Sequence, residues 1–316
     1  MSSLVDCPHC GAAQGAPLFD AADPLSADRF EIRRCTRCAL VHVSPRPTPE
    51  RLAQYYPDGY FGKRHPLLKN FFMNLRVGAL PATPGRVLDI GCGRADFLMA
   101  CRRRGWRVAG VEQDGAPIME LRRELGLEVV STTELATLPD ASFDAVTMWH
   151  VFEHMFDPHE MLREIVRLLR PGGTAVIEVP NFGSWQARID PQYWFHLDVP
   201  RHLLHFERPT LEAMLDSEGL RPVRWSTFSA EYDAFGILQS FLNRLCTTPN
   251  YLFQVLIGRR GKGTAGDALV TALTTLPLAA LATILAVVAP LFGEGGVLRV
   301  VAVKPLQATG GGQVSP

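Results

Sequence analysis

The feature that most constrains this chain is a short apolar run that ends in a carboxylate and a glycine-rich turn. Residues 87–90 read Val-Leu-Asp-Ile, residues 91–93 read Gly-Cys-Gly, and a helical pattern starts at Asp96. Strand, glycine turn and helix in this order are typical of the first unit of a doubly wound parallel sheet, where ligands bind at the carboxyl ends of the strands. Because glycine lacks a side chain, a ligand can approach bare backbone N–H groups. The sequence therefore predicts a nucleotide-type site at this turn.

The alternation of strand and helix continues beyond this unit. We expect strands at residues 86–90, 107–112, 128–130, 143–149, 173–179, 221–228 and 297–303, and helices at 96–104, 116–125, 157–170 and 210–217. Short strands separated by helices predict an α/β fold, a Rossmann-like, doubly wound sheet of seven strands with helices on both faces.

Two cysteine pairs near the start of the chain have the spacing of a zinc site. Cys7 and Cys10 form one C-x-x-C pair, and Cys35 and Cys38 form the other. Two such knuckles supply four thiolates to a closed, tetrahedral, structural Zn²⁺ site. A redox-active pair or unligated thiols are the alternatives. With the other three cysteines scattered, we predict a zinc ribbon in a reducing, cytoplasmic setting.

Two classes of nucleotide cofactor compete for the glycine turn. A NAD-type fingerprint needs a third glycine where Asp96 stands, so an NAD-linked enzyme is the weaker alternative. The stretch 87–96 instead resembles the first motif of the class I S-adenosylmethionine-dependent methyltransferases, with Ala95 in place of the usual third glycine. Glu112, about twenty residues after the turn, ends the second strand, where a carboxylate can accept both ribose hydroxyls.

This resemblance implies a cofactor site for S-adenosylmethionine. Asp89 is expected to fix the amino-acid end of the cofactor, and Glu112 its ribose. The complete set of expected cofactor-binding residues is Asp89, Gly91, Cys92, Gly93, Glu112, Gln113 and His150. The usual acid for the adenine amino group is missing, because Ser131-Thr132-Thr133 stands at its position.

The segment after the fourth strand also resembles the ubiquinone-type small-molecule methyltransferases. It reads His-Val-Phe-Glu-His over residues 150–154, and Leu168–Gly173 matches the approach to their fifth strand. The same letters spell an inverted zinc-protease signature, which would need both histidines on one long helix. In the ubiquinone-type enzymes the equivalent segment is associated with a divalent metal, which implies His150, Glu153 and His154 as candidate ligands; we favour the alternative that Glu153-His154 orders the floor of the cofactor pocket.

The acceptor-binding residues are expected in the histidine-rich stretch 194–206. Its Pro-Arg-His-Leu segment, residues 200–203, resembles that of methyltransferases from polysaccharide and lipid-modification clusters. We predict His202 as the general base, with His154 and then His150 behind it, because a base is needed when the acceptor is an alcohol or a carbon atom. The alternative is that these histidines only hydrogen-bond loop carbonyls.

A charge-free run covers residues 268–293, long enough to cross a bilayer. A single crossing would leave the last strand on the wrong side, and we expect Pro277 to break the run. With the apolar segment 237–257 we predict a helical hairpin in one leaflet, its basic link 259–262 near anionic headgroups. A buried helical pair or a dimer interface is the alternative.

These features divide the chain and set its expected function. The predicted parts are 1–45 (zinc ribbon), 46–83 (linker and helical lead-in), 84–236 (methyltransferase domain), 237–296 (apolar insertion), 297–305 (last strand) and 306–316 (flexible tail). We expect methyl transfer to a small-molecule acceptor, a glycan or lipid-linked intermediate, on the inner face of the cytoplasmic membrane. The formal net charge of zero argues against a nucleic-acid partner. A non-catalytic scaffold is the alternative from another class.

Overall fold

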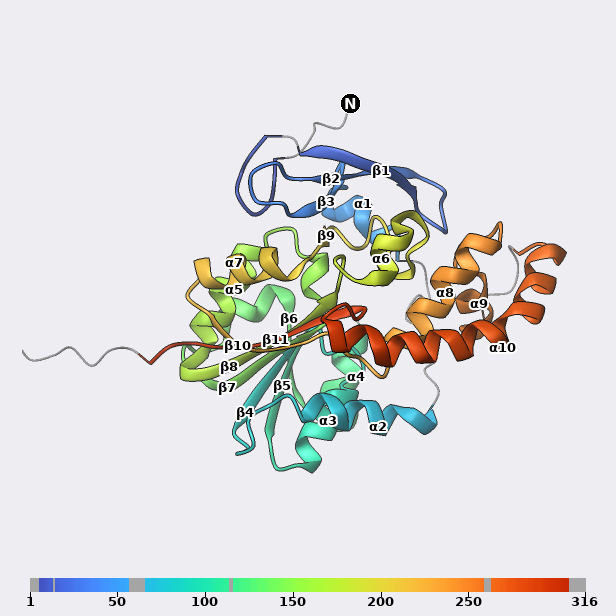
Figure 1. Cartoon of the computed structure of the whole chain (residues 1–316). Helices are drawn as coiled ribbons and strands as arrows, with labels where there is room; N and C mark the ends of the chain where they lie inside the picture. The colour runs from blue at the N-terminus through green and yellow to red at the C-terminus, as the bar shows by residue number, and fades with distance from the viewer. Residues whose placement is uncertain (1–5, 14, 57–65, 114–115, 259–262, 307–316) are drawn as a thin grey trace, which may run out of the picture.

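The computed structural model describes residues 6–13, 15–56, 66–113, 116–258 and 263–306. A small sheet formed mainly by the N-terminal strands lies against one end of a larger α/β domain, and a group of three helices projects from the side of that domain (Figure 1). Of the predicted segments, the basic link 259–262 and tail residues 307–316 lie outside the described residues.

The large sheet confirms the predicted fold class. Its seven strands run in the order β10-β11-β8-β7-β4-β5-β6. Their bounds are β4 (Arg86–Ile90), β5 (Arg107–Glu112), β6 (Glu128–Ser131), β7 (Phe143–Trp149), β8 (Leu169–Pro180), β10 (Arg221–Ser226) and β11 (Val297–Val303). Neighbouring strands are parallel across β6, β5, β4, β7 and β8. Strand β11 lies between β8 and β10 and is antiparallel to both. The chain therefore comes back to the sheet after the apolar insertion, as expected.

Helices cover both faces of this sheet. Their bounds are α1 (Pro49–Ala53), α2 (Pro66–Val77), α3 (Asp96–Arg103), α4 (Ala116–Leu125), α5 (Pro158–Leu168), α6 (Trp185–Ile189) and α7 (Arg208–Ser217). Successive residues of β4 pack on opposite faces of the sheet. Leu88 and Ile90 belong to the apolar core that includes α5 and α7, and Val87 belongs to the core that includes α2, α3 and α4. Burial on both faces explains why the strands read as nearly continuous apolar runs.

The small sheet is not built from the N-terminal segment alone. It has the order β1-β2-β3-β9, with β1 (Ala16–Ala22), β2 (Arg29–Arg34), β3 (Val41–Ser44) and β9 (Leu204–His205). Strand β9 belongs to the histidine-rich stretch and pairs antiparallel with β3. The predicted ribbon at 1–45 is therefore completed by a strand that belongs to the larger α/β domain.

The apolar insertion forms three helices: α8 (Asp233–Leu245), α9 (Tyr251–Leu256) and α10 (Ala265–Val288). The expectation that Pro277 breaks the run is wrong, because α10 continues through it. One side of α10 packs on α8 through small residues such as Ala282 and Ala286, which allow the two helices to approach closely. This contact with α8 accounts for a helix that spans the proline.

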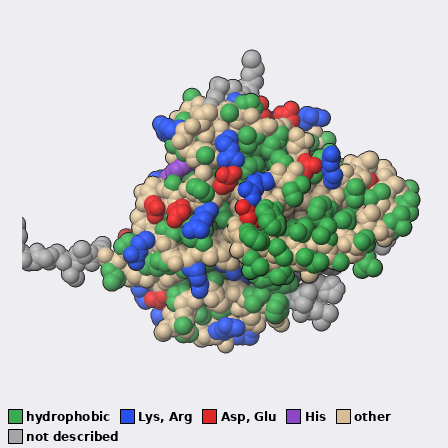
Figure 2. All heavy atoms as spheres, in the orientation of Figure 1, with side chains coloured by type: hydrophobic (Ala, Val, Ile, Leu, Met, Phe, Trp, Pro, Cys, Tyr) green, Lys and Arg blue, Asp and Glu red, His purple; other side chains and the backbone are tan. Residues whose placement is uncertain are grey.

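The remaining surface of α10 is apolar and exposed. The most apolar 18-residue window of the stretch Ala265–Phe292 has a mean hydropathy of 2.2, and only 17% of that window is buried. By length and composition it is one helix that can cross a membrane. Leu273 and Leu276 are 69% and 82% exposed, and hydrophobic side chains are gathered over α10 in Figure 2. The side of α10 that packs on α8 thus agrees with the alternative of a helical pair, and the predicted hairpin in one leaflet stays a prediction for the exposed side.

Candidate functional site

The glycine turn lies between the carboxyl ends of two neighbouring parallel strands, β4 and β5. Its backbone is left-handed at Gly91 (φ 75°) and Gly93 (φ 53°). A Cβ at Gly91 would collide with the side chain of Val151, whereas a Cβ at Gly93 would meet nothing within 4 Å. The turn therefore presents main chain to open space at Gly93, as the sequence predicts.

The N–H groups of this turn are nevertheless engaged. Gly91 and Cys92 both donate to the Val111 carbonyl, at 2.8 and 3.0 Å. The N–H of Gly93 donates to Glu112 Oε2 at 2.5 Å. The prediction of bare N–H groups is therefore wrong at these positions, and Glu112 is the group that a ribose would meet beside Gly93.

The two other residues predicted near the turn differ in exposure. Cys92 is buried, and its Sγ lies where a Cβ at Gly110 would be, so its side chain packs under the turn. Burial raises the pKa of this thiol. Gln113 is exposed, and its backbone N–H donates to Glu112 Oε1 at 2.9 Å. Gln113 therefore helps to hold the Glu112 carboxylate at the strand end.

Asp89 is a buried carboxylate at the end of β4. It is 3% exposed and accepts a hydrogen bond from Thr147 Oγ1 at 2.6 Å. Burial raises the pKa of Asp89 to about 7, against the opposing effects of the Thr147 hydroxyl and the Arg76 guanidinium. A cationic ligand group would therefore meet a carboxyl poised to ionise near neutral pH.

Arg76 on α2 is a site residue that the sequence analysis missed. Its guanidinium lies 5.1 Å from the centroid of the Trp149 ring and donates to Glu231 at 2.7 Å and to the Tyr232 hydroxyl at 3.2 Å. The residue is 8% exposed, which is rare for an arginine on a helix. Its partners Glu231 and Tyr232 come from a distant part of the chain, so no local pattern marks it.

His150 is held between two buried carboxylates. Its ring nitrogens lie 3.4 Å from Glu153 and 3.2 Å from Glu178, and its backbone is left-handed at φ 55°. Burial favours the neutral ring, but contacts with these carboxylates raise the pKa of His150 to about 10. Since a protonated imidazole cannot accept a proton, this environment argues against His150 as the base.

His154 and His202 are placed differently. His154 Nδ1 lies 2.7 Å from the Arg201 carbonyl and 3.1 Å from the Tyr56 hydroxyl, which holds the ring against the loop. His202 Nδ1 donates to the His196 carbonyl at 2.7 Å, so the lone pair is on Nε2. Burial lowers the pKa of His202 to about 4, which keeps the ring neutral at pH 7. Its geometry suits it best for the role of a base.

A cavity of about 160 Å³ lies beside these histidines. His150 and His202 line it, whereas His154 is not among its described lining residues. His150 is followed by Val151, which packs on the glycine turn at Gly91. One short segment after β7 therefore contacts both the glycine turn and the cavity.

Two groups of side chains are close enough to hold a metal ion. Glu153, His154 and His202 place ligand atoms within 4.8 Å of one another, as do the four predicted cysteines. The segment containing Glu153 is a short 3₁₀ turn, Phe152–His154, and not the long helix that a zinc protease would need. This excludes the protease geometry.

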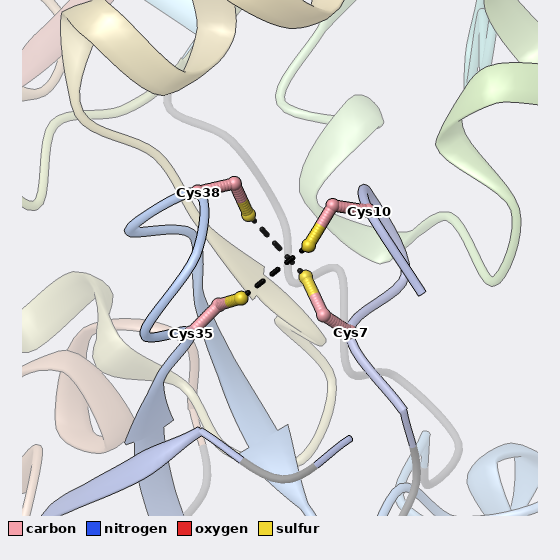
Figure 3. A group of neighbouring side chains, drawn as sticks. All are labelled: Cys7, Cys10, Cys35 and Cys38. Carbon is pink, nitrogen blue, oxygen red and sulfur yellow. Dashed lines mark hydrogen bonds between the residues drawn. The ribbon is translucent and has the colours of Figure 1, made fainter. Parts of the chain in front are cut away.

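The four cysteine sulfurs point toward a common centre (Figure 3). The Sγ atoms of Cys7 and Cys38 are 3.5 Å apart, as are those of Cys10 and Cys35. A disulfide would need about 2.05 Å, so these are four free thiols. Tetrahedral thiolate coordination is the chemistry of a structural zinc site, and this donor set fits it.

Comparison with known proteins gives one family and several partial relatives. A family model described as a methyltransferase domain matches residues 63–224, just over half of the 316 residues. Ubiquinone biosynthesis O-methyltransferases of Xanthomonas campestris pv. campestris (strain B100) and Alkalilimnicola ehrlichii are 38% identical over 115 residues and 31% over 103. These alignments cover 33% and 30% of this chain and 47% and 42% of the relatives. The chain thus spans less than half of their length.

Two further similarities are to proteins described as S-adenosylmethionine-dependent methyltransferases. A probable S-adenosylmethionine-dependent methyltransferase of Mycolicibacterium smegmatis is 36% identical over 100 residues, covering 30% of this chain and 38% of the relative. The solved structure of a SAM-dependent methyltransferase from Archaeoglobus fulgidus aligns with a TM-score of 0.47 and 23% identity, over 75% of this chain and 93% of that one.

Proposed function

Since the chain belongs to the methyltransferase domain family, we propose that it transfers a methyl group from S-adenosylmethionine to a small-molecule acceptor. The observation that carries this proposal is the convergence of Asp89, Gly93 and Glu112 at one edge of the parallel sheet. A crevice of main chain between two carboxylates suits a ligand that has an ammonium group and a ribose.

The residues of the crevice fit the cofactor. The Asp89 carboxylate would pair with its ammonium group, and the nearby Arg76 guanidinium offers a counter-charge for its carboxylate. Glu112 would exchange its bond to Gly93 for the ribose hydroxyls, and open space at Gly93 leaves room for the sugar. The cofactor supplies the electrophilic methyl group, so the protein has mainly to align the acceptor with it.

His202 is the residue that we assign to the acceptor proton. Its ring is neutral, its Nδ1–H is anchored on a carbonyl, and it lines the cavity that His150 borders. A hydroxyl bound there would lose its proton to Nε2 as its oxygen attacks the methyl group. The protonated His150 lies between carboxylates and supplies fixed positive charge beside the cavity.

We assign the acceptor to the glycan or lipid-linked class, and the enzyme to the inner face of the cytoplasmic membrane. The support for this is the exposed apolar surface of α10. Helix α10 belongs to the same insertion as α9, and Phe253 and Gln254 of α9 line the cavity. A peripheral helix of this kind buries its apolar side chains at the boundary of headgroups and acyl chains. The acceptor's headgroup would then reach the cavity from the bilayer surface.

The cofactor proposal is tested by calorimetric titration with S-adenosylmethionine at pH 6 and pH 8. With a pKa of about 7, Asp89 is mostly protonated at the lower pH and ionised at the higher one. Since the ammonium group pairs with the carboxylate, binding should be about tenfold tighter at pH 8. Asp89→Asn should lose this pH dependence. A wild-type protein that binds no S-adenosylmethionine at either pH contradicts the proposal, and formation of S-adenosylhomocysteine with a lipid extract of the source cells tests the transfer itself.

Membrane association is tested by flotation with vesicles of phosphatidylglycerol and phosphatidylcholine. The wild-type protein should float, and a Leu273→Glu, Leu276→Glu variant should bind vesicles about a hundredfold more weakly, because it replaces two exposed leucines of the proposed membrane-facing surface by charges. Ile189→Glu changes an exposed apolar residue of α6 and serves as the matched control, with unchanged flotation expected. A wild-type protein that stays in the bottom fraction rules out the peripheral assignment.

A further inference from the structure

The cavity beside His202 has walls from three separate parts of the chain. Pro24 and Leu25 come from the turn between β1 and β2, Phe195 from the histidine-rich stretch, and Phe253 and Gln254 from α9. The N-terminal ribbon therefore contributes directly to the cavity in which we place the acceptor.

A buried ion pair fixes the ribbon turn in this position. Arg201 is fully buried, and its Nη2 donates to Asp23 Oδ1 at 2.8 Å and to Asp198 Oδ1 at 2.6 Å. The other oxygen of Asp23 accepts the backbone N–H of Ser26 at 2.7 Å, which closes the turn that carries Leu25. Because an unpaired buried charge is costly, Arg201 holds the ribbon turn and the cavity loop in one arrangement.

The backbone ties the same two parts together. The N–H of Val43 in β3 donates to the Leu203 carbonyl at 3.1 Å, and the N–H of Leu203 donates to the Glu153 carbonyl at 2.9 Å. The ribbon sheet is thus hydrogen-bonded to the loop that carries His202, and that loop to the segment after β7.

The size and chemistry of the cavity indicate what it holds. About 160 Å³ is well below the roughly 300 Å³ at which pockets for drug-sized ligands begin, so one ring of a larger acceptor fits. Phe195, Tyr232 and Phe253 supply aromatic surface. Asn250 Oδ1 accepts a hydrogen bond from Asn243 Nδ2, and Gln254 Nε2 donates one to the Pro249 carbonyl. Within the described residues, the amide nitrogen of Asn250 and the amide oxygen of Gln254 have no hydrogen bond. Aromatic faces with one amide donor and one amide acceptor suit a ring that bears several hydroxyls.

We propose that this cavity binds a sugar ring of the acceptor and that the zinc ribbon, through Leu25, forms one of its walls. The statement that the bound molecule is the methyl acceptor rests on the proposed function. It makes the ribbon a determinant of acceptor specificity in addition to its structural role.

Saturation-transfer NMR on the full zinc-loaded chain tests this, with S-adenosylhomocysteine present and the methyl glycosides of glucose, galactose, mannose and rhamnose as probes. Catechol is the comparison probe for a phenolic ring. We expect a signal from at least one glycoside, and its loss in Leu25→Trp, which fills the cavity, and in Phe253→Ala, which removes an aromatic wall. Leu18→Trp is the matched control, because Leu18 is an exposed ribbon leucine outside the cavity lining, and it should keep the signal.

Zinc content and thermal melting show whether each variant is folded. The proposal is overturned if no glycoside gives a signal, if only catechol does, or if the glycoside signal survives in both Leu25→Trp and Phe253→Ala. Titration with S-adenosylmethionine is a separate measurement: a wild-type protein that binds a glycoside but no S-adenosylmethionine contradicts the proposed function and leaves the sugar cavity standing.

Discussion

Replacing Asp89 by alanine is expected to weaken the binding of S-adenosylmethionine by about a hundredfold or more. The carboxylate is 3% exposed, so its partner ammonium group would lie in a site with little water to replace the lost charge. Removing one member of a buried charge pair costs about 2–5 kcal/mol or more in binding. The change also leaves the Thr147 hydroxyl without the acceptor that it now has at 2.6 Å. Isothermal titration calorimetry measures the loss.

Asp144→Asn is the matched control for this experiment. Asp144 is also a carboxylate beside the parallel strands, but it lies near the start of β7 and accepts the backbone N–H of Arg86 at 2.6 Å, at the opposite edge of the sheet. Its amide variant should bind S-adenosylmethionine as the wild type does. Equal affinities for Asp89→Ala and the wild type, with both folded by circular dichroism, would remove Asp89 from the cofactor site.

Replacing Cys35 by serine is expected to abolish zinc binding and to unfold the ribbon. The four sulfurs lie within 4.8 Å of one another, and three thiolates cannot close a tetrahedral site. Structural zinc contributes an apparent binding free energy of about 10–16 kcal/mol in small zinc domains, more than the β1–β3 sheet can replace by packing. Atomic absorption should show one zinc per wild-type chain and none in the variant, with faster hydrogen exchange in β2 and β3.

Cys246→Ser is the control for a general cysteine effect. Cys246 lies at the end of α8, far from the cluster in sequence, and its variant should keep one zinc and the wild-type melting curve. A Cys35→Ser protein with full zinc content would show that the ribbon holds its metal in some other way. Retention of β3 protection without zinc would show that pairing with β9 alone sustains the small sheet.

The elements that could be predicted from the sequence are those that a local pattern specifies. The bounds of β4, β5, β7 and β11 agree with the expected strands, because a strand buried on both faces reads as an apolar run between turn residues. The start of α5 agrees as well, since Asp157 accepts the Glu160 N–H at 2.8 Å as a side-chain cap. Asp89, Gly93 and Glu112 lie near one another because parallel strands bring their carboxyl ends to one edge, and their role in cofactor binding stays a prediction.

Local patterns were insufficient where a contact joins distant segments. Pro277 is tolerated in α10 because packing on α8 stabilises the helix around it, which no helix-breaking rule includes. Arg76 is marked by no spacing, because its partners Glu231 and Tyr232 come from a distant part of the chain. The three candidate histidines, which the sequence ranked only by the motifs around them, received different environments: His150 two carboxylates, His154 a carbonyl and a hydroxyl, and His202 a carbonyl and the cavity.

The sequence by itself determined the fold class and the cysteine cluster, because each depends on short-range periodicity or on fixed spacing. The tertiary structure alone decided that β9 completes the ribbon sheet and that Leu25, Phe195 and Phe253 share one cavity. It also decided that His202 lines that cavity and that His150 lies between two carboxylates, because long-range folding sets which groups come within a few ångströms of each ring.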